Sequence, residues 1–319
     1  MEHRSGGDTF SLSPARPSPR RMTYLLTLLA VAAVLVGAGG AWLARPTGPD
    51  VALALSWEEG RTYRYRIEIG MDGDMSLFAR DIPFTADFGE VVRMTVLEID
   101  PSGATTFEVT VESISGTFNG IPIPPDPRQI PPVRMTVTDH GRVVTEEGLT
   151  LPAPTSGPGS TNPFSQMFPL FPDHPVGPGD TWEIRYRQPI PFGRGGVEVD
   201  TVNAFLRYHG VDGTRVAVLD SRVGSLFDFE IDLARLAEAA GQANSSVPSD
   251  PPVDAVVRYE GATEGRQVAW VDPRAGEVVK VTSEADVELG TELVGGAAPA
   301  GLGLEFSFDG ELTASMERL

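Results

Sequence analysis

The sequence predicts a mainly β protein: a single N-terminal transmembrane helix, then a curved antiparallel sheet or half-barrel built from two similar β modules, with one short inserted helix. Three observations predict this class. Residues 22–44 carry no charged side chain, and about 20 apolar residues are enough to cross a hydrocarbon core. After them, apolar and polar residues alternate in short runs, as in half-buried strands. The turns between these runs recur in the same order in both halves of the chain.

The uncharged run 22–44 determines where we expect the rest of the chain to lie. A basic arm, residues 1–21, precedes it and contains Arg4, Arg16, Arg20 and Arg21. Positive charge beside a first span keeps that end in the cytoplasm. We therefore expect a signal anchor in the cytoplasmic membrane, with the C-terminal domain outside. Lys280 is the only lysine among 25 basic residues, which indicates a GC-rich bacterial genome.

A cleaved signal peptide is the alternative interpretation of the same run. Val36 and Ala38, or Gly39 and Ala41, could form a cleavage site, and the domain would then be secreted. We favour the uncleaved anchor because the apolar run continues to Trp42, an aromatic residue typical of the membrane interface.

Composition excludes several chemistries. The chain has no cysteine, so it has no disulfide, thiolate metal ligand, cysteine nucleophile or lipid-modified cysteine. Its net charge is −19, and residues 46–319 hold 20 of the 25 basic and 42 of the 44 acidic residues, which gives them a charge near −22. This charge argues against nucleic acid as a partner.

The first β module is predicted at 55–148, after a linker at 45–54. Its first strand places Tyr63, Tyr65, Ile67 and Ile69 on one face. A hairpin then runs from Val92 to Val111 through a turn at 100–103, and a second hairpin turns at 139–141 after a proline-rich bridge, 121–132. Between the strands, Asp72 and Asp74 resemble the opening of a calcium loop but lack its glycine and closing Glu, so a hairpin tip is the better interpretation.

A Pro/Gly-rich connection is predicted at 149–178. Residues 149–180 contain 8 Pro and 4 Gly, and long connections of this kind are often functional. The connection contains an apolar cluster that solvent would not tolerate fully exposed: Phe164, Met167, Phe168, Leu170 and Phe171. Two interpretations stay open, a cover that contacts an apolar ligand in a sheet groove and ordinary core filling beneath a loop.

The second module is predicted at 179–319 and repeats the pattern of the first. Residues 179–182 parallel 60–63, the turn at 211–213 parallels 100–103, and the turn at 272–276 parallels 139–141. A helical insertion at 228–253 begins at the N-cap Asp232 and stops at Gly241. A last strand or two is expected over 304–316, with a turn at 309–310.

Chemical signatures are sparse. The histidines His3, His140, His174 and His209 lack the spacing of a zinc site, and no serine-hydrolase elbow occurs. Asp228, Glu230 and Asp232 could converge on a cation, although an exposed strand edge is the better interpretation. We predict no catalytic, cofactor-binding or metal-binding residue.

Two motifs carry a resemblance to known proteins. They are Pro175-Val176-Gly177-Pro178-Gly179-Asp180-Thr181-Trp182 and the hairpin from Trp270-Val271-Asp272 through Gly276-Glu277-Val278. Over Leu55 to Leu289 the chain resembles a family of uncharacterised bacterial exported proteins with a duplicated strand-rich module. The closing hairpin is also similar to those of the lipoprotein-carrier half-barrel group, in which a curved sheet wraps an apolar groove. This resemblance implies a fold rather than an activity.

The sequence thus favours a non-enzymatic, membrane-anchored, extracytoplasmic protein that binds an apolar or lipid-like ligand. Two alternatives stay open: a cell-envelope protein–protein interaction or structural module, and an envelope hydrolase that uses paired carboxylates.

Overall fold

One antiparallel sheet contains every strand of the structure that can be described. The computed structural model describes residues 48–77, 80–123, 130, 132–147, 167–189, 193–211, 213–232, 256–294 and 305–319. The first half contributes β1 (Thr62–Leu77), β2 (Arg80–Ile99), β3 (Thr105–Phe118), β4 (Ile121–Ile123), β5 (Val133–Val137) and β6 (Val143–Glu147). The second half contributes β7 (Thr181–Pro189), β8 (Gly193–Val211), β9 (Thr214–Asp232), β10 (Val256–Asp272), β11 (Glu277–Val294) and β12 (Glu305–Arg318).

The strand order shows two meanders that meet at one seam. The order across the sheet is β6-β5-β3-β2-β1-β12-β11-β10-β9-β8-β7, with β4 paired to β3. The chain therefore moves outward from β1 to the edge strand β6, crosses to the opposite edge at β7, and returns strand by strand until β12 pairs with β1. The connection between β6 and β7 joins the two edges of the sheet.

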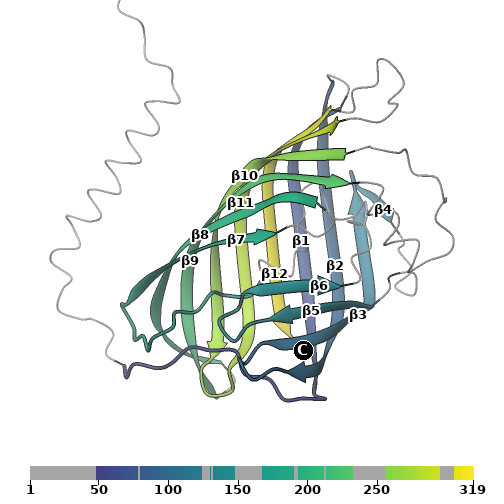
Figure 1. The fold of residues 1–319 in the computed structure, drawn as a ribbon. Coiled ribbons are helices and arrows are strands. Elements are labelled where there is room, and N and C mark those ends of the chain that lie inside the picture. The colour runs from purple at the N-terminus through teal and green to yellow at the C-terminus, as the bar shows by residue number, and fades with distance from the viewer. Residues whose placement is uncertain are drawn as a thin grey trace, which may run out of the picture. The chain divides into compact units, whose positions relative to one another are not determined.

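The sheet curves strongly, so that it has an inner and an outer face (Figure 1). The predicted alternation on β1 is confirmed: Tyr63, Tyr65 and Ile67 are 2%, 0% and 1% exposed, and the residues between them are exposed. Ile67 pairs with Met316 on β12, which is also buried, so the same inner face continues across the seam. The predicted mainly β, antiparallel fold is confirmed.

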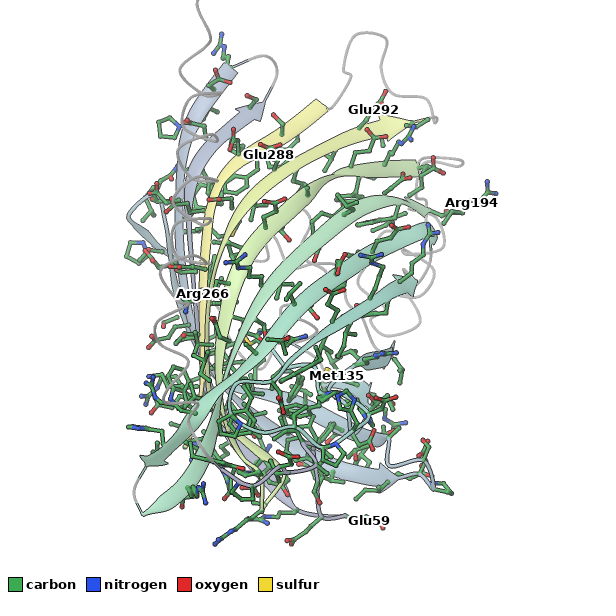
Figure 2. The ribbon with its side chains drawn as sticks, turned by 90° about the vertical axis from the view of Figure 1, so that its left-hand side faces the viewer. Glu59, Met135, Arg194, Arg266, Glu288 and Glu292 are labelled. Atoms are coloured by element: carbon green, nitrogen blue, oxygen red, sulfur yellow. The ribbon has the colours of Figure 1, made fainter. Side chains whose placement is uncertain are left out.

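Three hairpin turns gather at one end, which we call the floor end. The turns at 100–104, 138–142 and 272–276 lie there, as do the start of β1 and the last residue, Leu319. Figure 1 shows the segment before β1 (purple) running across this end. In Figure 2, Met135 and Glu59 lie toward the floor end, whereas Glu288 and Glu292 lie toward the opposite end.

Several local predictions were wrong because the strands are longer than their turn-like residues indicate. Asp72 and Asp74 do not form a hairpin tip, since β1 continues to Leu77 and both lie within the strand. Residues 309–310 are not a turn but pair along β12 with β1 and β11. Asp228 to Asp232 belong to β9, which lies between β8 and β10 and is not an edge.

Two predicted helices fall outside the described residues. The uncharged run 22–44 is one, and the inserted helix between β9 and β10 is the other. Within the described part of the chain, no helix has the length and apolar character needed to cross a membrane.

Candidate functional site: the inner face of the sheet

The floor end is closed by two segments that run between the strands. These floor segments are residues 48–57 and 167–176. They are joined to each other by a pair of backbone hydrogen bonds between Val51 and Val176, of 2.9 and 3.0 Å. The first segment also bonds to two hairpin turns, because Leu55 N donates to Asp139 O and Ser56 N donates to Gly276 O. The backbone of the floor is therefore tied to both meanders.

The second floor segment links the two edges of the sheet. Phe171 N donates to His140 O in the turn between β5 and β6, at 3.1 Å. On the other side, the Trp182 indole Nε1 of β7 donates to Leu170 O, also at 3.1 Å. Arg142 lies over the ring of Tyr186 on β7, with 5.6 Å between its guanidinium carbon and the ring centroid. The edge strands that are farthest apart in the sheet order thus approach each other at the floor.

The predicted apolar cluster lies in this floor. Met167, Phe168, Leu170 and Phe171 are 1–7% exposed and belong to the main hydrophobic core. Trp57 packs edge to face on Tyr63, Phe107 and Phe168 in the same core. Phe164 lies outside the described residues. The structure brings the four described residues together as core, and a ligand-contacting role for them stays a prediction.

A cluster of ion pairs around the buried Glu277 connects the start of β1 with the end of β12 at the floor end. The Glu277 side chain is 7% exposed and forms ion pairs with Arg318 and, at 3.6 Å, with Arg61. Both arginines also lie near the ring of Tyr63. Burying a carboxylate is tolerable only when opposite charges accompany it, so this cluster has a structural role at the start of β1 and the end of β12.

The inner face remains apolar beyond the floor, toward the opposite end of the sheet. One cluster spans β1, β2, β11 and β12 and contains Met71, Phe84, Ala86, Val287, Leu289 and Phe308. A second cluster lies on β8 and β9 and contains Val197, Val199, Phe227 and Phe229. The two are separate clusters of buried residues, and Tyr259 on β10 packs against both. Two apolar clusters therefore lie on the inner face, one at the seam between β1 and β12 and one toward the β7 edge.

A row of polar side chains crosses the inner face between the floor and the second cluster. The register places Ser283, Gln267, Ser221 and Asn203 opposite one another on β11, β10, β9 and β8. Asn203 Nδ2 donates to Thr201 Oγ1 at 2.9 Å and to the Trp182 carbonyl at 3.4 Å. Farther from the floor, the Ser225 hydroxyl is buried without a hydrogen-bond partner among the described residues.

One carboxyl group faces inward among these apolar residues. Glu90 on β2 pairs with Ile67 on β1 and with Ile114 on β3, so the three side chains share the inner face. Burial raises the pKa of Glu90 from 4.5 to about 7 because removal from water disfavours the charged form. No neighbouring carboxylate contributes to this shift, so the paired-carboxylate arrangement of the hydrolase hypothesis is not formed here.

The outer face carries the acidic charge. Exposed ion pairs such as Arg266 with Asp220 and Arg185 with Asp200 connect neighbouring strands. Among the described residues, no group of three or more His, Asp or Glu is placed to hold a metal ion. Asp228, Glu230 and Asp232 alternate with inward-facing Phe229 and Ile231, so they point to the outer face.

The sequence analysis did not identify Glu90 as a site residue, although a signal was present. Phe88, Glu90, Val92 and Met94 occupy every second position of β2, so the glutamate interrupts an otherwise apolar face. The fold places this interruption inside the curve of the sheet.

Together these features define the class of protein: a strongly curved antiparallel sheet that is closed at one end and apolar along its inner face. Comparison with protein-family models and with curated proteins gave no match. The fold and the inner face therefore carry the functional argument.

Proposed function

We propose that this chain is a non-enzymatic binding protein that holds an apolar or lipid-like ligand against the inner face of its sheet. In this proposal, residues 22–44 anchor the protein in a bacterial cytoplasmic membrane and the sheet lies on the extracytoplasmic side. The single observation that carries the binding role is the pair of apolar clusters beyond the floor, on strands whose outer faces are charged.

The floor supports this role by supplying a core that does not depend on a ligand. The largest cluster of buried residues already includes residues from both meanders and from both floor segments. The two clusters beyond the floor are separate from this core, so a ligand that contacts them would not have to displace it. Binding apolar surface there would contribute about 25 cal/mol for each Å² removed from water.

We also propose that the two meanders descend from one duplicated module. The turns that correspond in the two halves each use a glycine with positive φ: Gly60 and Gly179 (74° and 96°), Gly103 and Gly213 (88° and 81°), and Gly141 and Gly276 (83° and 67°). This conformation is strained for other residues. The same strand order after each pair supports duplication more strongly than the turns alone.

The direct test is recovery of a bound ligand. The full chain would be purified from its membrane fraction, extracted with organic solvent and analysed by mass spectrometry. An apolar molecule in stoichiometric amount is the expected result. Leu289→Asp, which places a charge on the inner face of β11, should lose that molecule, whereas Glu288→Gln on the adjacent outer position should retain it.

The opposite result would be an extract that contains no apolar molecule, together with no binding of the neutral apolar dye N-phenyl-1-naphthylamine. That pair of findings would overturn the binding role. It would leave the envelope interaction module as the better interpretation, with the edge strand β7 as its contact surface.

A further inference from the structure

Glu90 is the feature of the inner face that its apolar surroundings explain least. A side chain at this position of β2 has buried apolar neighbours along the strand, since Val92 and Met94 are each 0% exposed. Across the strands it faces Ile67 and Ile114. An isoleucine or valine would fit this pattern without the cost of burying a carboxyl group.

The described residues give Glu90 no compensating partner. It takes part in no hydrogen bond or ion pair with them, in contrast to Glu277, whose two arginines neutralise it. The inner face of β3 carries no charged group beside it, because Glu112 points outward to Arg64. On the adjoining strands, the register places Tyr65 of β1 and Arg318 of β12 on the same face, and Arg318 is paired with Glu277.

We propose that Glu90 binds the head of an amphipathic cation, so that the ligand of this protein is a long apolar chain ending in a protonated amine. This inference rests on the proposed binding function and narrows it to one chemical class. The apolar chain would lie along the inner face, and the ammonium group would donate hydrogen bonds to the Glu90 carboxylate.

The electrostatics of the site favour an ammonium head group over a carboxylate or an alcohol. An ion pair in a site of low dielectric is much stronger than one in water, and the ammonium would satisfy a carboxylate that has no partner among the described residues. A fatty-acid carboxylate would instead meet a like charge whenever Glu90 is ionised. A neutral alcohol could donate one hydrogen bond but would not compensate the charge. The acidic outer face adds a long-range attraction for a cationic ligand.

Protonation of Glu90 should make the affinity for an amine depend on pH, and this dependence can be measured. Burial raises the pKa of Glu90 to about 7, so at pH 6 roughly nine in ten of the ligand-free molecules would carry a proton that must leave when an ammonium binds. The apparent affinity for an amine is reduced by the fraction of competent molecules. It should therefore rise about tenfold from pH 6 to pH 8, and the affinity for a carboxylate should change in the opposite direction.

The experiment uses the full chain in a nonionic amphipathic polymer and the neutral dye N-phenyl-1-naphthylamine. Dodecylamine, dodecanol and dodecanoic acid, which share one chain and differ in the head, are then compared as displacers at pH 6 and pH 8. We expect dodecylamine to displace the dye at a concentration at least tenfold below that of dodecanoic acid at pH 8. Glu90→Gln should remove this preference and its pH dependence.

Glu68→Gln is the matched control, because Glu68 lies on the outer face of the adjacent strand β1 and is exposed. It should behave as the parent chain does. Dye binding by Glu90→Gln shows that this variant is folded. If the parent chain binds the dye but shows no preference for the amine, the inference about the head group fails while the binding function stands. If the parent chain does not bind the dye, both fail.

Discussion

At the scale of single residues, the buried Glu277 and the half-buried Glu90 have opposite settings. Glu277 is held between Arg61 and Arg318, and its side chain is 7% exposed. Glu90 faces isoleucines and has no such partner among the described residues. The folded state gives the first carboxylate two opposite charges and gives the second an apolar setting that disfavours its charged form. The two residues therefore give opposite expectations for substitution.

Replacing Glu277 with Gln should destabilise the chain by about 3 kcal/mol, because removing the buried carboxylate takes from Arg318 its ion-pair partner and leaves Arg61 only the exposed Glu58. Urea unfolding followed by the β-sheet signal in circular dichroism would measure this. Glu58→Gln is the control, since the Glu58 side chain is 73% exposed and an exposed pair contributes less than about 1 kcal/mol. Equal stability of the two variants would contradict the structural role of the cluster.

Glu90 should make the ligand-free chain less stable as pH rises. Its pKa is 4.5 when exposed and about 7 when folded, so between these values the folded state holds a proton that the unfolded state has released. The stabilising contribution is complete below pH 4.5 and is lost as pH rises through 7, to a total of roughly 3 kcal/mol. Glu90→Gln should therefore be the more stable protein at pH 8, with a smaller difference near pH 5. A pH series of urea midpoints tests this, and a constant difference would contradict it.

At the scale of elements, the floor depends on a close approach between one turn and one floor segment. A Cβ atom on Gly141 would lie 2.1 Å from Pro169 O, and Gly141 also has a φ of 83°. At Gly179 φ is 96°, but nothing lies within 4 Å of a Cβ atom there. Substitution of Gly179 therefore tests backbone strain alone, whereas substitution of Gly141 tests strain together with a steric clash.

Gly179→Ala should cost about 1 to 2 kcal/mol, the strain of the left-handed conformation alone. Gly141→Ala should cost more, because the second floor segment must also move away from the turn between β5 and β6. Thermal unfolding of both variants measures the difference. In Gly141→Ala, protease cleavage within residues 167–176 should also become faster. Equal costs and unchanged cleavage would show that this contact does not hold the floor.

For the individual elements, the sequence predicted the positions of strands and turns well but the lengths of the strands poorly. The alternation from Tyr63 to Ile69 and the turn at Asp139 were identifiable because local pattern and turn chemistry determine them. The full length of β1 was not, since Asp72 and Asp74 have low strand propensity and are held there by pairing with β2 and β12. Glu90 was missed for a related reason. The alternation shows that it shares a face with Val92 and Met94, but only the curvature of the sheet makes that face the inner one.

At the scale of the whole molecule, residues 46–319 form one compact unit. The main core contains residues of β1, β5, β8 and β11, together with both floor segments. Neither meander can keep this core without the other. We therefore expect calorimetry to show one cooperative unfolding transition for this unit, with equal calorimetric and van't Hoff enthalpies. Two separated transitions would show instead that the meanders are independent domains.

The seam between β1 and β12 has a further consequence for biosynthesis. β1 is among the first parts of the sheet to leave the ribosome, but the strand it needs on one side, Glu305–Arg318, is made after all the others. Partners so distant along the chain are slow to find each other. Nascent β1 thus waits with one edge unpaired, and a molecular chaperone that shields this edge would act earlier than one that recognises the finished sheet.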